Sequence, residues 1–427
     1  MTARPTGLLR AYGALAGVLA SLAYPRVRRK LARHGTDTAR FGERMGHATL
    51  PRPTGRLVWF HAASVGESLS ILRLIDQMGI ENPSLSFLIT SGTATSADLV
   101  ARRMPPRTRH QFSPLDSPAA VRRFLDHWHP DAGVFVESEL WPNMLRGAAD
   151  RGMPLALLNA RISDRSVRGW TRVAGTARYL LGLFAMIHTQ DARTTAHLHA
   201  LGLAQARTGV NLKALAGPLP VDMDAARSMQ NAIGARPVWV ASSTHPGEEE
   251  VILQAHAEVL RHRPDALLIL VPRHPDRASH VKALISQSGL SVAQRSTGET
   301  PNPATQVYLA DTLGETGLWY HLCPIVCLGG SFTPVGGHNP YEPAHAGAAI
   351  LHGPLYANFA GAYAAFHTHG GAVEVADAPA LAAAVTALMD APAALAAQRT
   401  LSAEFAALQE DQMGALIETL SRALRLG

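Results

Sequence analysis

The sequence predicts an α/β protein with two doubly wound parallel-sheet domains and a cleft between them, preceded by an apolar and basic N-terminal segment. Three observations support this prediction. The chain has 427 residues, more than one ordinary hydrophobic core holds. From residue 57 onward, short apolar runs alternate with helical stretches, which is the pattern of strands buried on both faces of a parallel sheet. These runs form two series, separated by a proline-containing segment without strand character.

The apolar runs set the expected domain limits. The first series is LVWFHAA (57–63), SFLITS (86–91), GVFVES (133–138) and PLALLNA (154–160). The second series is PVWVASS (237–243), ALLILVP (266–272), QVYLAD (306–311), PIVCLGGS (324–331) and AAILHG (348–353). We therefore expect a first domain over residues 36–216, a linker with a short helix over 217–236 and a second domain over 237–427. The Ala-rich tail of the second domain is helical in pattern, and we expect it to pack back across the cleft.

The composition indicates an ordinary folded protein in a reducing compartment. Apolar residues make up 47% of the chain, which argues against wholesale disorder. The two cysteines, Cys323 and Cys327, lie four residues apart in the apolar segment CPIVC. Buried thiols are the favoured interpretation, and nothing indicates a secreted domain built on disulfides.

The N-terminal segment carries the positive charge of the chain. Residues 1–56 hold eleven Arg and Lys against Asp37 and Glu43, so the balance of the remaining residues is slightly negative. Residues 11–25 are free of charge and RVRRK (26–30) follows at once. Fifteen helical residues reach about 22 Å, short of a ~30 Å hydrocarbon core. We expect residues 1–35 to form a membrane-surface or shallow anchor helix, with a single span and a soluble helix as alternatives. The following basic cluster places the bulk of the chain in the cytoplasm and favours an anionic membrane over nucleic acid as partner.

The stretch HAASVGES (61–68) places Glu67 where a helix begins after the first strand. An acidic residue in a first helical turn stabilises the helix by about 0.3–1 kcal/mol. The same position lies at the carboxyl end of a strand, where open α/β sheets bind their ligands. From its local pattern alone, Glu67 can therefore be interpreted either as a helix cap or as a catalytic base.

Charged residues also follow later strands of the first series. Glu137 and Glu139 end GVFVES, and charges at the end of a buried strand are costly unless they are paired or used. Arg161 and Arg165 follow the next strand as possible counter-charges. Lys213 stands just before the linker and is expected at the cleft.

The second series contains the richest turn of the chain, GGSFTPVGGHNPYEPA (329–344). Gly336 and Gly337 permit a close backbone approach, and Pro340 is suited to the start of a helix. The free N–H groups at the start of this helix would then bind a phosphate, and the Glu342 side chain would bind a ribose. Arg273 in VPRHPDR follows another strand, and its guanidinium group would bind a phosphate there. A P-loop is absent, and no convincing G-x-G-x-x-G follows the first strand, which argues against a P-loop NTPase and a usual dinucleotide domain.

The remaining polar clusters are expected to have structural roles. The three acids of ASSTHPGEEE (241–250) are expected to act as helix-dipole partners. The pairs HWH (127–129) and HLH (197–199) are expected to be surface or core histidines, because no further ligands stand near them in the sequence. No metal site is expected.

Six motifs occur in an order that resembles one family. HAASVGES, ESELWPN, NARISDRS, VPRHPDR, DTLGE and GGSFTPVGGHNPYEPA together are similar to the 3-deoxy-D-manno-octulosonic acid (Kdo) transferases, and the likeness covers nearly the whole chain. Two departures are Cys323-Pro324, where members often have Ala-Asp, and Tyr341, where Leu is usual.

The resemblance implies a GT-B glycosyltransferase that moves Kdo from CMP-Kdo to the lipid A precursor with inversion, at the cytoplasmic face of the inner membrane. It implies Glu67 as catalytic base and Glu137 and Lys213 as transition-state stabilisers. The implied CMP-binding residues are Pro272, Arg273, Leu313, Gly314, Glu315, Asn339, Pro340, Tyr341 and Glu342. Neither a cofactor nor a metal is implied.

Two other functions compete with this expectation. A GT-B-like sugar-nucleotide epimerase shares the fold but needs neither an anchor nor an acceptor. A non-enzymatic lipid-binding protein would use the basic N-terminus and would not need the carboxylates. Release of CMP from CMP-Kdo only in the presence of the lipid acceptor separates the three.

Overall fold

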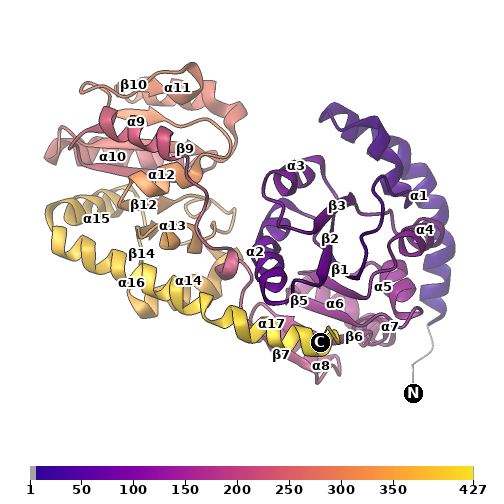
Figure 1. The fold of residues 1–427 in the computed structure, drawn as a ribbon. Coiled ribbons are helices and arrows are strands. Elements are labelled where there is room, and N and C mark those ends of the chain that lie inside the picture. Colours follow the sequence, from indigo (N-terminus) through magenta and orange to yellow (C-terminus); the bar gives the residue numbers. More distant parts are fainter. Residues whose placement is uncertain (1–5, 427) are drawn as a thin grey trace. The chain divides into compact units, whose positions relative to one another are not determined.

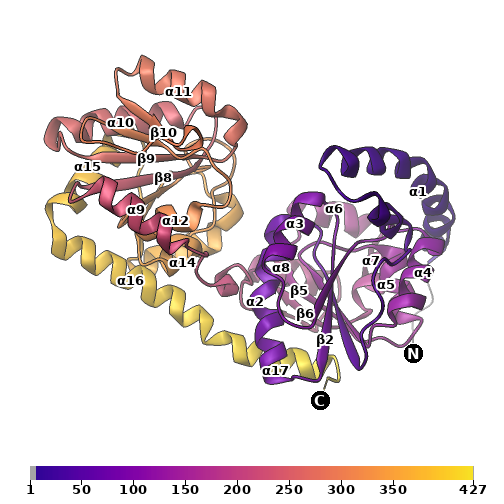
Figure 2. The same ribbon diagram turned by 45° about the horizontal axis from the view of Figure 1, so that its top comes forward.

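A computed structural model describes residues 6–426, which form two compact units (Figures 1 and 2). The first unit contains the residues up to Ala216 together with those from Asp411 onward, and the second contains Gly217–Glu410. The first domain boundary therefore falls beside residue 217, where the sequence changes from strand-rich to proline-containing. The expected cleft between the domains stays a prediction.

The first unit is built on a seven-stranded sheet in the order β3-β2-β1-β4-β5-β6-β7, and every pairing is parallel. Chain order reverses between β1 and β4, which makes this sheet doubly wound. The strands are β1 (Arg56–His61), β2 (Leu85–Ser91), β3 (Thr108–Phe112), β4 (Ala132–Val136), β5 (Leu155–Ala160), β6 (Phe184–Thr189) and β7 (Ala206–Thr208).

Helices cover both faces of this sheet. They are α1 (Gly7–Arg33), α2 (Val65–Glu81), α3 (Ala94–Arg102), α4 (Pro118–Trp128), α5 (Pro142–Ala149), α6 (Asp164–Arg172), α7 (Ala174–Leu181), α8 (Ala192–Ala200) and α17 (Gln412–Ala423), with 3-10 turns at Thr38–Met45 and Ala214–Ala216. Successive residues of β1 enter different cores. Val58 and Phe60 pack with α2, whereas Leu57 and Trp59 pack with α4 and α5. Because both faces of the strand are buried, its sequence is a continuous run of apolar residues.

The end of the chain belongs to the first unit, not to the second unit as expected from the sequence. Leu416, Ile417 and Leu420 of α17 are buried in the same core as α2. Helix α17 contacts α2, β5 and β6. Because α17 completes the cover of this sheet face, the first unit is assembled from two separate segments of the chain.

The second unit repeats the plan with the strand order β10-β11-β9-β8-β12-β13-β14, again entirely parallel. Its strands are β8 (Val238–Thr244), β9 (Leu267–Pro272), β10 (Val292–Gln294), β11 (Val307–Leu309), β12 (Ile325–Leu328), β13 (Ala349–His352) and β14 (Ala372–Glu374). Chain order reverses between β8 and β12. The two-domain doubly wound prediction is therefore confirmed at the level of both sheets.

The helices of the second unit lie on both faces of its sheet. They are α9 (Met223–Ile233), α10 (Glu249–His262), α11 (Ala278–Gln287), α12 (Thr316–Leu322), α13 (Tyr341–His345), α14 (Ala360–His369), α15 (Ala378–Asp390) and α16 (Pro392–Glu410), with 3-10 turns at Pro275–Arg277, Arg295–Thr297 and Ala357–Phe359. Helix α9 is the short helix expected in the linker, and it contacts α12. Cys323 and Cys327 are buried free thiols, as predicted.

Helix α1 lies along the flank of the first unit (Figures 1 and 2). By length and composition it is the one described helix that on its own could cross a membrane, and 17% of its apolar window is buried. Leu9 near its start and Leu31 near its end are both buried. Its outer face is defined here as Leu8, Leu15, Val18, Leu19, Leu22, Arg26, Arg29 and Arg33, all of which are exposed.

Candidate functional site

The candidate catalytic site lies in the first unit at the carboxyl ends of β1 and β4. These strands are neighbours, with His61 opposite Phe135. The chain leaves β1 toward α2 on one sheet face and leaves β4 toward α5 on the other. Ligands of open α/β sheets bind where such connections diverge. The topology therefore brings the two carboxylate-bearing loops predicted from the sequence to one place.

Glu67 occupies the first turn of α2 and takes part in its N-cap. The Ser64 hydroxyl accepts a hydrogen bond from the Glu67 N–H at 3.3 Å and donates to Glu67 Oε1 at 2.7 Å. The Ala63 N–H donates to Glu67 Oε2 at 2.9 Å. This is a variant of the capping box, so the capping interpretation of Glu67 describes real contacts. These contacts also fix the carboxylate in one orientation at the end of β1.

The Glu67 carboxylate is largely buried and lies near two other carboxylates. Burial raises the pKa of Glu67, and the charges of Glu137 and Glu139 raise it further, while the hydrogen bonds from Ser64 and Ala63 oppose the shift. Glu67 is only 9% exposed. A carboxylate whose pKa is moved toward neutrality is better suited to accept a proton.

Glu137 is paired with Lys213, whereas the sequence had suggested Arg161 and Arg165 as its possible counter-charges. Lys213 Nζ lies 3.0 Å from Glu137 Oε1, and Asn159 Nδ2 donates to the same oxygen at 3.4 Å. Glu137 has φ of 57° and Asn159 has φ of 54°, both in the left-handed region that side chains other than glycine rarely adopt. Such conformations cost energy and concentrate at functional sites. The strand end is thus bent to hold the Glu137 carboxylate beside the ammonium group.

Glu139 takes a different partner because β4 ends at Val136 and the loop turns. Its Oε2 lies 3.4 Å from His61 Nε2 and accepts a hydrogen bond from Trp141 Nε1 at 2.5 Å. Burial opposes ionisation of Glu139, but the His61 and Trp141 contacts prevail and hold its pKa below the usual value. Sequence reasoning missed His61. Its position as the last residue of β1, two residues before the turn, was the signal available.

The second unit also carries polar residues at the carboxyl ends of its strands β8, β9 and β12. His245 follows β8, and its Nε2 lies 2.9 Å from His338 Nε2, with the two rings stacked. Burial lowers the pKa of His338 to about 4, and the neighbouring charges of His245 and Arg273 lower it further. Arg273 directly follows β9 and is exposed. This edge therefore combines an exposed guanidinium with a neutral histidine pair, and sequence reasoning identified only the arginine.

The acids after β8 do more than complement a helix dipole. The buried Glu248 carboxylate accepts hydrogen bonds from the N–H groups of Gly330, Ser331 and Phe332, at 2.6, 2.9 and 2.8 Å. Glu249 is fully buried and pairs with Arg277 at 2.6 Å. Glu249 lies in the first turn of α10, as expected for a helix-dipole partner, and the contacts of both acids also hold the loop after β12 and the turn before α11 against the start of α10.

The glycines of the 329–344 turn are explained by the chain's own packing. Gly336 and Gly337 have φ of 103° and 80°. A Cβ on Gly336 would lie 2.5 Å from Asn358 Nδ2, and one on Gly337 would lie 2.9 Å from Tyr356 Cα. The predicted close backbone approach is present, and its partner is the segment before α14. These glycines therefore do not by themselves indicate a phosphate.

The predicted nucleotide residues 339–342 have distinct environments. Asn339 Oδ1 accepts the Tyr341 N–H at 3.2 Å, and Asn339 Nδ2 donates to Glu342 Oε1 at 3.3 Å. Pro340 is the N-cap of the five-residue α13. Tyr341 is 4% exposed and packs on Phe366 and Phe405 in the core. Of this group, the Asn339 and Glu342 side chains form the polar pair, whereas the Tyr341 ring stabilises the unit.

The turn after β11 carries the remaining predicted residues. Leu313 is 77% exposed, which is unusual for a large apolar side chain. Gly314 has φ of 87°, and a Cβ there would meet no atom within 4 Å. The Glu315 carboxylate is held by Arg295 at 2.6 Å, which lowers its pKa. Arg295 lies twenty residues earlier, and sequence reasoning did not find it. Pro272 is the last, buried residue of β9.

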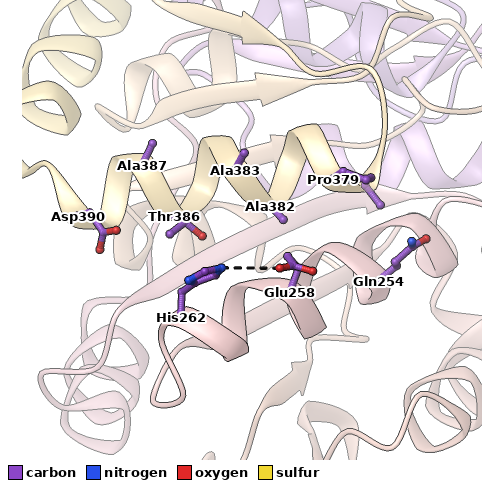
Figure 3. A pocket seen from close by; sticks show the side chains of 10 residues that line it. Gln254, Glu258, His262, Pro379, Ala382, Ala383, Thr386, Ala387 and Asp390 are labelled. Carbon is purple, nitrogen blue, oxygen red and sulfur yellow. Dashed lines mark ion pairs between the residues drawn. The ribbon is translucent and has the colours of Figure 1, made fainter.

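A separate groove lies between α10 and α15 (Figure 3). Small side chains such as Ala383 and Ala387 line one wall, and Glu258 pairs with His262 at 3.7 Å on the other. None of the candidate site residues lines it. Among residues 6–426, no three His, Cys, Asp or Glu side chains are grouped so that they could hold a metal ion. His127 and His199 instead bond to the backbone oxygens of Leu50 and Ala206, consistent with their expected ordinary roles.

The two doubly wound parallel sheets define the GT-B fold, which consists of two Rossmann-like domains. Solved structures agree. A glycosyltransferase from Rickettsia africae is 11% identical, with a TM-score of 0.62 over 88% of this chain and 100% of that chain. A UDP-GlcNAc 2-epimerase from Neisseria meningitidis is 12% identical, with a TM-score of 0.60 over 86% of this chain and 100% of that chain. At these identities the likeness shows the fold alone.

Sequence relatives give the family. Residues 39–216 match the family model described as 3-deoxy-D-manno-octulosonic-acid transferase (kdotransferase). A probable mitochondrial 3-deoxy-D-manno-octulosonic acid transferase from Arabidopsis thaliana is 36% identical over 81% of this chain and 79% of its own length. The 3-deoxy-D-manno-octulosonic acid transferase of Haemophilus influenzae is 33% identical over 87% of this chain and 86% of its own length. The chain belongs to this family and is therefore a glycosyltransferase.

Proposed function

We propose that this enzyme transfers Kdo from CMP-Kdo to a lipid A precursor with inversion at the anomeric carbon. The observation that supports this most directly is the state of Glu67. Its carboxylate is fixed at the switch point of the first sheet, and burial and two neighbouring carboxylates raise its pKa. The site can thus hold a general base, which the attack of a hydroxyl on a sugar carbon requires.

The proposed step is a single displacement. Glu67 accepts the proton of an acceptor hydroxyl while the acceptor oxygen forms a bond to the anomeric carbon of Kdo. The bond from that carbon to the CMP phosphate oxygen breaks, and CMP leaves with the electron pair. Glu137 follows the neighbouring strand β4, and Lys213, just before the 3-10 turn Ala214–Ala216, is paired with it at 3.0 Å. Both are proposed to stabilise the charges of the transition state. One displacement inverts the anomeric centre.

The second unit is proposed to bind CMP. The proposed residues are Pro272, Arg273, Leu313, Gly314, Glu315, Asn339, Pro340, Tyr341 and Glu342. Arg273 supplies a cation for the phosphate, and Leu313 offers an exposed apolar surface to the base. Tyr341 can contribute only through its backbone, because its ring is buried. We propose that cationic side chains, rather than a metal ion, neutralise the leaving phosphate.

The membrane contact is proposed to be α1 lying in the interface of the inner membrane at its cytoplasmic face. Tyr12, Gly13 and Leu31 hold the helix against the first unit along its length, so a spanning helix would have to abandon these contacts. The outer face of α1 presents large apolar side chains followed by three arginines at helical spacing. Such a face suits an anionic lipid surface.

Acceptor-dependent release of CMP tests the proposal. Purified full-length protein is incubated with freshly made CMP-Kdo, with and without a tetraacylated lipid A precursor, and the lipid product is weighed by mass spectrometry. We expect CMP release only with the lipid, and a product heavier by whole Kdo units. Release of nucleotide without acceptor would favour an epimerase-like reaction, and lipid binding with no release would favour a lipid-binding protein.

A further inference from the structure

A hydrogen bond joins α1 to the interior of the first unit. The Tyr12 hydroxyl donates to Asp116 Oδ2 at 2.9 Å. Tyr12 lies between the packed face and the outer face of α1, and Asp116, in the loop between β3 and α4, is 8% exposed. Gly13 packs beside Asn143, where a Cβ would lie 3.4 Å from Oδ1. The helix that faces outward is thus in direct contact with buried polar groups.

Asp116 provides the N-terminal cap of α5 from another loop. Trp141 at the N-cap position makes no side-chain cap hydrogen bond. Instead, Asp116 Oδ2 accepts the Asn143 N–H at 3.1 Å, and Asp116 Oδ1 accepts the Met144 N–H at 2.8 Å. Asn143 Nδ2 also donates to the Asp116 carbonyl oxygen at 2.6 Å. These are the first-turn donors that a helix leaves unpaired, so Asp116 fixes where α5 begins.

The start of α5 in turn limits the loop that carries the candidate catalytic carboxylates. Only residues 137–141 separate the end of β4 from Pro142. Within this loop Trp141 donates to Glu139, and Glu137 has the strained backbone noted above. Both carboxylates act on the pKa of Glu67. A shift of the α5 start would therefore move both groups that set the charge environment of Glu67.

We propose that Tyr12 is a positioning residue that couples the seating of α1 on a lipid surface to the placement of Glu137 and Glu139. This inference rests on the proposed function of the first-unit site. Seating the outer face of α1 on lipid restrains the helix, and the Tyr12–Asp116 hydrogen bond transmits that restraint to the first turn of α5. The enzyme is then more active when its acceptor is offered in a bilayer than when it is dispersed in detergent.

The test uses full-length Tyr12→Phe, which removes only the hydroxyl. Tyr24→Phe is the matched control, because Tyr24 lies on the same helix and makes no side-chain hydrogen bond within the described residues. Transfer is measured with the lipid A precursor in anionic phospholipid vesicles and in nonionic detergent micelles. We expect Y12F to lose about tenfold in kcat in vesicles, with an unchanged KM for CMP-Kdo, and to lose the advantage of vesicles over micelles. Y24F should match the parent.

Amide hydrogen exchange supplies a readout that does not depend on activity. With vesicles present, the amides of Asn143 and Met144 should exchange faster in Y12F than in the parent, whereas Y24F should not change them. Asp116→Asn combined with Y12F should cost no more kcat than D116N alone, because both act through one contact. Parental exchange and parental kcat in Y12F would overturn the coupling while leaving the proposed function intact. An inactive parent would instead refute the proposed function, and the exchange arm would still decide the coupling.

Discussion

Ser64 and Glu67 bind each other reciprocally at the start of α2, with the Ser64 hydroxyl donating to Glu67 Oε1 at 2.7 Å and accepting the Glu67 N–H at 3.3 Å. The pair joins the helix cap to the proposed catalytic role of Glu67, which were alternatives in the sequence. The cap anchors the helix, and the same contacts hold a partly desolvated carboxylate at the sheet edge. A single residue can therefore be needed for rate and contribute modestly to stability.

Replacing Glu67 by Gln separates these functions. Glu67→Gln keeps the size of the side chain and most of its hydrogen bonding but cannot accept a proton. We expect the transfer rate to fall by about 10²–10⁴-fold, the usual contribution of a general base. The loss of the charge should cost at most about 1 kcal/mol of stability. Single-turnover transfer is measured beside thermal unfolding of the same sample. A near-parental rate would remove Glu67 from the chemistry, whatever the melting temperature.

Lys213 should control the acidic limb of the pH–rate profile. Lys213→Met removes the positive charge that lies 3.0 Å from Glu137 Oε1. Without that charge, the negative charge of Glu137 has a stronger effect on Glu67. The like charge of Glu137 already raises the pKa of Glu67, and the variant should raise it further. Because the base must be ionised, the acidic limb should move to higher pH. Lys213→Arg keeps the charge and serves as control. An unmoved limb in K213M would argue that the pair acts only structurally.

The strands of the fold could be predicted from the sequence where they are long and apolar. All nine predicted runs contain strands, because burial on both faces of a parallel sheet leaves a continuous apolar signature. Four of the five missed strands lack that signature, and the fifth, β6, carries it only over the short run FAMI (184–187). Edge strands β7, β10 and β14 have three residues each, and β3, TRHQF, is largely polar. The placement of α17 could not be read either, since an amphipathic helix shows which face is buried and not which sheet covers it.

The location of the candidate residues was predictable where they directly follow a strand. Glu67, Glu137 and Arg273 follow buried strands, and parallel strands end at one edge. Their partners were not predictable, because they come from distant segments. Glu248 binds backbone N–H groups 82 to 84 residues away, and the His245–His338 pair spans 93 residues. Local pattern assigned Glu248 to a helix dipole, and tertiary contact gives it a further role in holding the loop after β12.

Arg273 and Glu342 should each contribute to nucleotide affinity. Arg273→Ala removes a charge-assisted contact to phosphate, and Glu342→Ala removes a hydrogen-bond acceptor for ribose. Each loss should weaken CMP binding by about 1–3 kcal/mol in calorimetric titration. Arg261→Ala and Glu250→Ala remove the same charges from exposed positions on α10 and should bind like the parent. Chelation of divalent ions should leave transfer unchanged. Unchanged affinity in both site variants would place the nucleotide elsewhere.

The outer face of α1 should determine membrane attachment. Leu15, Leu19 and Leu22 are 60–66% exposed, so changing all three to Ser should have little effect on folding. Each Leu that enters hydrocarbon contributes up to about 1.5–3 kcal/mol, and the triple variant should therefore leave anionic vesicles in a flotation assay. Leu401 and Leu408 on α16 are also exposed, and their conversion to Ser is the control. Retention of the triple variant on vesicles would show that another surface makes the contact.

Acid should destabilise the protein through its buried neutral histidines. Burial lowers the pKa of His256 and of His352 to about 4, compared with about 6.5 for an unfolded chain. Between pH 6.5 and pH 4 the unfolded state therefore binds more protons than the folded state, and stability falls as the pH falls. Each such histidine adds up to about 1.4 kcal/mol per pH unit to the slope.

His256→Gln can still accept from Trp239 Nε1 and donate to the Gln306 carbonyl oxygen, the two contacts that His256 makes. Denaturant midpoints measured at pH 7, 5.5 and 4.5 should decline less steeply in H256Q than in the parent. Parallel declines would mean that His256 takes up its proton without unfolding and does not contribute to acid sensitivity.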